Sequence, residues 1–192
     1  MRTVVYMIRH SESPLEGDDR SRGLTQKGYL DAKRVYDTLK DKEIEIVVSS
    51  PYTRSILTVE KLAQQIGGDV LIFEDLKERK FASGENRPSD EELAPLLEMS
   101  FSDSNFSLEG GESNTDCQKR AIKVMIELLD NFKNKTIVIG THGVVMTLML
   151  GYYDNKYDLK FLQSTTKPDI YRLEFNQQEL VNVKRLKIVD NE

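Results

Sequence analysis

Hydrophobic residues in this chain fall into short runs typical of strands and longer stretches with a helical repeat. The short runs predict strands at residues 4–8, 44–48, 70–73, 136–139, 171–175 and 180–189. The helical repeats predict helices at residues 25–40, 50–65, 88–99 and 113–132, and a further one from 143. Because strands alternate with helices, we expect an α/β fold: a three-layer sandwich whose central, mostly parallel sheet is covered by helices on both faces.

Local signals refine this pattern at both ends of the chain. Thr25 and Ser50 are the predicted N-caps of the first two helices, and Pro51 suits the first turn of the second. The last two strands predict an edge hairpin that turns at residues 176–177. Residues 79–112 are polar for most of their length, so we interpret them as an insertion or lid within one domain that spans residues 1–192.

Composition narrows the classes of protein to consider. The chain has 192 residues, of which 39% are hydrophobic and 31% charged, enough apolar material for one packed core. Its net charge of −5 argues against a nucleic-acid partner. No apolar run approaches the length of a membrane span or a signal peptide, so we expect a cytoplasmic protein with no membrane partner. The single cysteine, Cys117, fits core packing better than disulfide or metal chemistry.

The two histidines of the chain carry the first functional signal. His10 and His142 each follow a hydrophobic run at the point where a strand is predicted to end. Ligands of open α/β sheets gather at the carboxyl ends of the strands, so both rings are expected to face one crevice. Taken singly, each histidine is equally compatible with a buried ring that caps its own loop.

Two arginines near the histidines in the predicted fold indicate that the site binds an anion. Arg9 precedes His10, and Arg54 lies in the first turn of the predicted second helix, where free amides and the helix dipole favour negative charge. Guanidinium groups bind phosphate oxygens well, so these residues predict a phosphate pocket. The histidines lack metal-ligand spacing and the arginines repel cations, so no metal and no cofactor is expected.

Several motifs in sequence order resemble those of the histidine phosphatase superfamily, also called the phosphoglycerate-mutase-like family. The matching segments are residues 8–13 (Ile-Arg-His-Ser-Glu-Ser), 24–28 with Ala32, 49–54 with Thr58, 76–78 (Leu-Lys-Glu), 110–113 (Gly-Gly-Glu-Ser) and 141–143 (Thr-His-Gly). The resemblance implies a phosphoglycerate-mutase-like fold and a phosphohistidine mechanism.

By motif position the resemblance assigns a role to each residue. His10 is implied as the nucleophile, with Arg9, Arg54 and His142 as phosphate binders and Glu78 as the proton donor. The chain departs from the usual pattern at Ser11, which replaces a glycine. It also lacks an asparagine that often touches phosphate a few residues after the nucleophile, and Ser13 is the candidate to replace it.

The chemistry of a phosphohistidine sets requirements on these residues. His10 needs an unprotonated attacking nitrogen, and its other ring nitrogen is expected to donate to a backbone carbonyl. Glu78 must be protonated when the ester binds and ionised when water attacks the intermediate, and Glu74 and Asp75 are alternative acids.

Substrate choice is open at this stage. Arg20, Arg22, Lys80 and Arg87 lie in polar loops expected to rim the crevice, where they would hold a second anionic group or remain solvated surface charges. We expect a small phosphorylated metabolite or a phosphoprotein as the partner, and the oligomeric state stays open.

The first hypothesis is a metal-independent phosphatase that hydrolyses phosphate monoesters through a phosphohistidine on His10. The nearest alternative is a phosphoglycerate mutase-type phosphotransferase, which shares the intermediate and differs in the acceptor. The short polar insertion favours hydrolysis, because a mutase must exclude water while its intermediate reorients. An alternative of another class is a non-catalytic module that binds a phosphate ligand.

Overall fold

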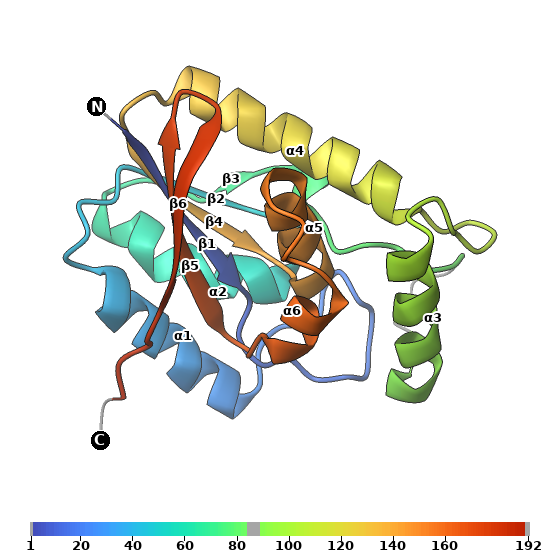
Figure 1. Ribbon diagram of the computed structural model, residues 1–192. Helices are drawn as coiled ribbons and strands as arrows, with labels where there is room; N and C mark the ends of the chain where they lie inside the picture. The colour runs from blue at the N-terminus through green and yellow to red at the C-terminus, as the bar shows by residue number, and fades with distance from the viewer. Residues whose placement is uncertain (1, 84–88, 191–192) are drawn as a thin grey trace.

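The central element of the computed structural model is a sheet in the order β3-β2-β4-β1-β5-β6 (Figure 1). The structure describes residues 2–83 and 89–190. The strands are β1 (Thr3–Arg9), β2 (Ile46–Ser49), β3 (Leu71–Ile72), β4 (Thr136–Thr141), β5 (Asp169–Asn176) and β6 (Glu179–Leu186). β1 to β4 run parallel to one another, and β5 and β6 form the antiparallel hairpin that the sequence predicts.

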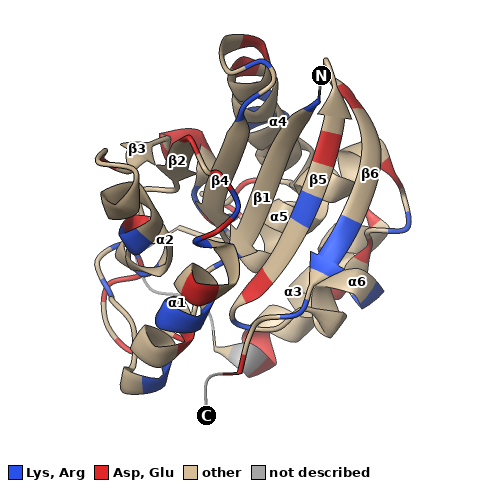
Figure 2. Ribbon diagram, turned by 90° about the vertical axis from the view of Figure 1, so that its left-hand side faces the viewer, with Lys and Arg blue, Asp and Glu red and all other residues tan. Residues whose placement is uncertain are grey.

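Helices cover both faces of this sheet. One face carries α1 (Gln26–Leu39) and α2 (Thr53–Gln65), and the other carries α4 (Asn114–Asn131) and α5 (Gly143–Tyr153), as Figures 1 and 2 show. The shorter α6 (Leu159–Ser164) contacts α5 and α3 (Asp90–Ser102). The three-layer α/β fold with a mostly parallel sheet is therefore confirmed.

Side chains of β1 alternate between the two faces of the sheet and so pack against both helical layers. Tyr6 and Ile8 pack in the core beneath α1 and α2, whereas Val5 and Met7 pack in the core beneath α4 and α5. Successive side chains of a strand point to opposite faces, so a strand buried on both faces must be apolar throughout. Charged residues accordingly gather on the helices, the loops and the hairpin in Figure 2.

Three local predictions differ from the structure. Ser50 and Pro51 precede the helix: α2 begins at Thr53, and its N-cap Tyr52 makes no side-chain capping bond. The Ser50 hydroxyl instead contacts His142, a residue far away in the sequence, and a local capping pattern cannot predict such a contact. β3 is only a two-residue edge strand, and the six-residue helix α6, capped by Asp158, was not predicted.

The segment predicted as an insertion contains α3, which begins with a capping box between Ser89 and Glu92. Arg79 ties this segment to the body of the protein: it is buried and donates to the Ser100 hydroxyl (2.7 Å) and the Phe106 carbonyl (3.2 Å). Cys117 lies in the core under α4, as expected. In the described part of the chain, every helix is too short or too polar to span a bilayer.

Candidate active site

The two histidines lie side by side at one end of the sheet. His10 follows β1 and His142 follows β4, and these neighbouring parallel strands pair in a register that sets Arg9 opposite Thr141. The backbone amide of His10 donates to the Thr141 carbonyl at 3.0 Å. The two rings meet edge to face with their centroids 5.2 Å apart. The ends of two adjacent parallel strands thus bring both imidazoles into one site, as the sequence predicts.

The ring of His10 is held in one tautomer. Its Nδ1 lies 2.6 Å from the carbonyl oxygen of Ser11, and a carbonyl only accepts, so Nδ1 carries the proton. The other nitrogen, Nε2, accepts a hydrogen bond from Nε of Arg54 at 3.2 Å. Burial lowers the pKa of His10 well below its usual range, and the charges of Arg54, Lys167 and Arg9 lower it further. The ring therefore presents an unprotonated Nε2 at neutral pH.

Arg54 reaches this position from the first turn of α2. Its side chain is almost fully buried, and burial lowers its pKa. One guanidinium nitrogen donates to the Asp19 carbonyl, and the same group forms an ion pair with the Asp19 carboxylate at 3.2 Å. The ring of Tyr52 stacks against the guanidinium, with 4.7 Å from Cζ to the ring centroid. Arg54 is thereby fixed with its Nε aimed at His10.

His142 is fully buried behind the first ring. Its Nε2 lies 2.7 Å from the Ser50 hydroxyl, and its ring packs edge to face on Tyr52 with centroids 4.9 Å apart. Among the described residues, Nδ1 of His142 has no hydrogen-bond partner. Burial lowers the pKa of His142 well below its usual range, and the neighbouring Arg54 lowers it further. The ring is neutral, and it is not among the residues that line the cavity described below.

Arg9 reaches the same site from the end of β1. Its guanidinium donates to the hydroxyl and to the carbonyl of Thr165, in the loop after α6. It also lies so close to Gly143 that a Cβ on that residue would be 2.9 Å from Arg9 Cζ. Gly143 therefore leaves the space that the arginine occupies.

Glu78 lies near the histidines, at the start of the helix that follows His142. Its carboxylate accepts hydrogen bonds from the backbone amides of Val144 (3.3 Å) and Val145 (3.2 Å), and a third from the amide of Arg79 (2.9 Å). Val144 and Val145 form the first turn of α5, which follows His142 directly. The positive end of this helix dipole thus holds the carboxylate beside the site.

A cavity of about 600 Å³ opens above His10, within the range of small-molecule sites. Arg9, His10, Arg54 and Glu78 all lie in its wall. The other polar wall residues are Asp18, Asp19, Arg20, Arg22, Tyr52, Glu74, Lys77, Arg79, Lys80, Gln163, Thr165 and Lys167. Among the described residues, no three His, Cys, Asp or Glu side chains gather as metal ligands would.

Of the predicted rim residues, Arg20 and Arg22 are engaged by the protein itself. Arg20 forms two hydrogen bonds with the Glu74 carboxylate, at 3.0 and 2.8 Å, and with Lys77 it lowers the pKa of Glu74 to about 2. Glu74 is therefore ionised and unsuited to donate a proton. Arg22 bonds the carboxylate of Asp19.

The remaining predicted residues divide into three cases. Lys80 lines the cavity. Ser13 does not: it is buried below the wall, and its hydroxyl accepts a hydrogen bond from Arg22 at 3.1 Å. Asp75 also lies outside the wall, where its carbonyl accepts from Arg120. Arg87 lies outside the described residues.

Four residues of the site were not singled out from the sequence. Asp19 bridges Arg54 and Arg22, Ser50 contacts His142, and Thr165 and Lys167 come from the loop between α6 and β5. Ser50 was the only one with a local signal, and that signal predicted a helix cap. The other three are ordinary loop residues until the chain folds.

Comparison with known proteins agrees with this geometry. The family model of the histidine phosphatase superfamily (branch 1) matches residues 5–187. The chain belongs to this superfamily. Its relatives include an uncharacterized phosphatase, PhoE, of Bacillus subtilis, with 24% identity over 153 residues that cover 77% of this chain and 76% of that protein. Phosphoglycerate mutase-like protein 4 of Arabidopsis thaliana is 26% identical over 194 residues, 95% of this chain and 79% of that protein.

Solved structures of other proteins share the fold. A mycobacterial glucosyl-3-phosphoglycerate phosphatase superposes with a TM-score of 0.76 at 17% identity, covering 96% of this chain and 97% of that one. A phosphoserine phosphatase of Entamoeba histolytica, solved with 3-phosphoglyceric acid, gives 0.76 at 21% identity, covering 99% and 98%. At these identities the likeness concerns the fold, and superfamily membership makes the chain a relative of phosphatases and mutases.

Proposed function

We propose that this protein is a metal-independent phosphatase that hydrolyses phosphate monoesters through a phosphohistidine on His10. The observation that carries the proposal is the state of that ring: Nδ1 donates to a carbonyl, so Nε2 is unprotonated beside Arg54 in the wall of a cavity that Arg9 also lines. Its substrate is a small phosphorylated metabolite or a phosphoprotein, and phosphatase-named relatives support the choice.

In the first step, Nε2 of His10 attacks phosphorus as the bond to the ester oxygen breaks. The charge of the transferring phosphoryl oxygens is held by the guanidinium groups of Arg9 and Arg54 and by Nδ1–H of His142. We assign the proton of His142 to Nδ1 because the Ser50 hydroxyl then donates to Nε2. These donors are held in place before the substrate arrives, so no metal is required.

Glu78 handles the protons of both steps. In its protonated form it donates to the leaving ester oxygen, and the resulting carboxylate is stabilised by the amides of Val144 and Val145. The carboxylate then accepts a proton from the water that attacks the phosphohistidine. The bond from phosphorus to Nε2 breaks, orthophosphate leaves, and His10 and Glu78 return to their starting states.

A phosphoglycerate mutase-type phosphotransferase is the second candidate, because several relatives carry mutase names. Both reactions pass through the same intermediate, and only the acceptor differs. Release of orthophosphate from a monoester without a bisphosphate primer, at an unchanged rate in the presence of a chelator, is expected for the phosphatase. Dependence of turnover on the primer would favour the mutase.

The deciding experiment detects the covalent intermediate. Wild-type protein and His10→Ala are mixed with a radiolabelled phosphate monoester and quenched in alkali, because phosphohistidine is labile in acid. We expect label on the wild type alone and a loss of turnover in His10→Ala on the order of 10⁴-fold or more. Label on His10→Ala would reassign the nucleophile, and neither label nor turnover across a broad ester panel would favour a non-catalytic binding module.

A further inference from the structure

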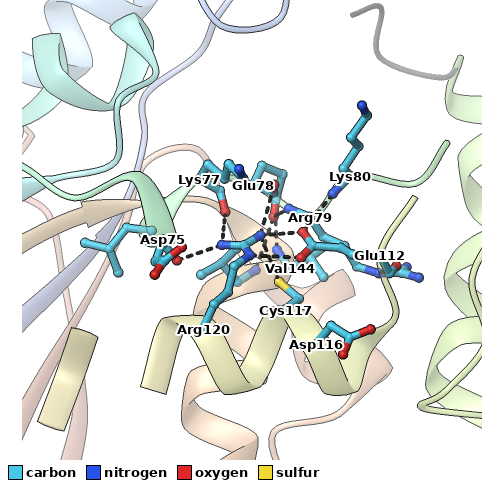
Figure 3. Close-up of polar contacts among 12 residues, drawn as sticks. Asp75, Lys77, Glu78, Arg79, Lys80, Glu112, Asp116, Cys117, Arg120 and Val144 are labelled. Atoms are coloured by element: carbon cyan, nitrogen blue, oxygen red, sulfur yellow. Dashed lines mark hydrogen bonds and ion pairs between the residues drawn. The ribbon is translucent and has the colours of Figure 1, made fainter. Parts of the chain in front are cut away.

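Arg120, on α4, binds the backbone at Glu78 and just before it. Its Nη1 donates to the carbonyls of Asp75 (2.7 Å) and Lys77 (2.9 Å), and its Nη2 donates to the carbonyl of Glu78 itself (3.3 Å), as Figure 3 shows. This stretch of chain leaves the short turn at Glu74–Leu76 and enters no regular element. Because the stretch is not part of a strand or helix, its backbone carbonyls depend on side-chain contacts such as these for hydrogen bonds.

Glu112 completes the arrangement from the other end of the inserted segment. Its carboxylate forms a two-point ion pair with Arg120, at 2.9 Å to Nε and 2.5 Å to Nη2, and also accepts the backbone amide of Lys80 at 3.1 Å. The backbone of Glu112 bonds the carbonyl of Lys80 at 2.8 Å. One ion pair therefore holds the chain before, at and after Glu78.

The contacts of Arg120 require a guanidinium. Its donors point in fixed directions from a planar group, and they meet carbonyls and a carboxylate that lie around it in Figure 3. The side chain is only 13% exposed, so these acceptors lose much of their contact with water and depend on Arg120 for hydrogen bonds. A shift of this group would move the Glu78 backbone, and with it the carboxylate seated on the amides of α5.

We propose that Arg120 and Glu112 are positioning residues that set the reach of Glu78 for proton transfer. This inference rests on the proposed function, in which Glu78 protonates the leaving group. Neither residue lines the cavity, so both act through Glu78 and not on the substrate. Through Glu112, the Gly-Gly-Glu-Ser motif at residues 110–113 would then help to position the acid that protonates the leaving group.

The test compares two esters that differ in their need for an acid. p-Nitrophenolate leaves without protonation, whereas an alkyl oxygen, as in 2-glycerol phosphate, requires it. We expect Arg120→Met to lower kcat/KM for the alkyl ester on the order of 10²-fold. The rate for the aryl ester should stay nearly unchanged, because its leaving group needs no proton from Glu78. Glu112→Gln is expected to show the same selectivity in weaker form. Adding Arg120→Met to Glu78→Gln should cause little further loss on the alkyl ester.

The control is Arg172→Met, which removes another partly buried arginine ion pair, with Glu174 on β5, away from the site. It should leave both rates unchanged. If Arg120→Met does not fold, Arg120→Lys, which keeps the charge without the planar fork, is measured in the same way. Equal losses on both esters, or full additivity with Glu78→Gln, would overturn the inference while Glu78 keeps its role. If Glu78→Gln itself lowers both rates equally, the acid assignment falls and the inference falls with it.

Discussion

The hydroxyl of Ser50 lies 2.7 Å from Nε2 of His142 and fixes that ring in the site. Ser50 follows β2 and His142 follows β4, and these two strands are paired in the sheet. A hydroxyl that the local sequence marks as a helix cap thus serves a residue far along the chain. The contact occupies Nε2 of His142, so Nδ1 is the nitrogen to which the proposed mechanism assigns phosphate binding.

We expect Ser50→Ala to lower activity and stability together. Without the hydroxyl, the buried Nε2 of His142 loses its partner, which costs about 1–3 kcal/mol of unfolding free energy. The ring also loses its defined tautomer, so we expect kcat to fall by about tenfold or more. Urea denaturation and turnover of a phosphate ester measure the two effects.

Ser49→Ala is the matched control for this change. Ser49 is equally buried, and its hydroxyl bonds Ser55 at 2.9 Å instead of a histidine. It should lose stability without a comparable loss of kcat. Equal effects of the two substitutions on kcat would show that Ser50 contributes only to folding.

The close approach of Gly143 to Arg9 leads to a second prediction. In Gly143→Ala the new methyl group would lie about 2.9 Å from Arg9 Cζ, so the guanidinium must move. Because the proposed mechanism gives Arg9 a phosphate-binding role, a shift of this size is expected to lower kcat/KM on the order of 10²-fold. The folded state should tolerate the change, because alanine suits a helical position and only the end of a flexible side chain is displaced.

Gly68→Ala is the control that separates the displacement of Arg9 from the general effect of replacing a glycine by alanine. A Cβ at Gly68 meets only Ile66, at 4.0 Å, so this variant should keep full activity. Full activity of Gly143→Ala as well would mean that the position of Arg9 is not critical to the reaction.

A third prediction concerns the planar group of Arg54. Lysine at this position keeps the charge but cannot both donate to His10 and pair with Asp19 as the guanidinium does. We expect Arg54→Lys to lower kcat by about 10²–10³-fold, the loss typical of enzymes from which one hydrogen-bond donor to the transition state has been removed. The inhibition constant of orthophosphate should rise in parallel. A variant that retains wild-type kcat would remove Arg54 from the transition state.

The fourth prediction is a pH dependence of stability. Burial holds the pKa of both His10 and His142 below the unfolded value of about 6.5. As pH falls through that value, the unfolded chain takes up protons that the folded chain does not. The unfolding free energy should therefore fall by about 1.4 kcal/mol per pH unit for each histidine, and it should be fully retained above that value.

Urea denaturation at several pH values just below neutrality measures this slope. His10→Gln places a neutral side chain at the same position and should remove about half of the slope. A slope that is identical in the variant and the wild type would mean that the ring of His10 takes up its proton in the folded protein as readily as in the unfolded chain.

The central part of the fold was predictable because its signals are local and repeated. The apolar run of β1 and the run of β4 each end at a histidine, and parallel strands present their carboxyl ends at one edge. Periodicity alone did not show that β4 pairs with β1, since sheet order depends on contacts between distant segments. The roles implied for His10, Arg9, Arg54, His142 and Glu78 stay proposals, and the structure adds that all five lie together.

Other features were decided only by tertiary packing. Asp19 and Ser13 lie in the same polar loop, yet Asp19 holds Arg54 at the cavity whereas Ser13 turns to Arg22 below the wall. Nothing in the loop composition distinguishes them. Arg120 likewise belongs to a regular helix, and its importance comes from the carbonyls that the folded chain brings to it.

The amino-acid sequence by itself determined the order of strands and helices, the two histidines at strand ends and the family motifs, because hydrophobic period and residue type act over a few neighbouring positions. Tertiary structure alone decided which ring nitrogen of His10 is unprotonated, which hydroxyl contacts His142 and which arginine binds the backbone of Glu78. Hydrogen bonds between distant segments have no local signature, since they form only when burial removes water from both partners.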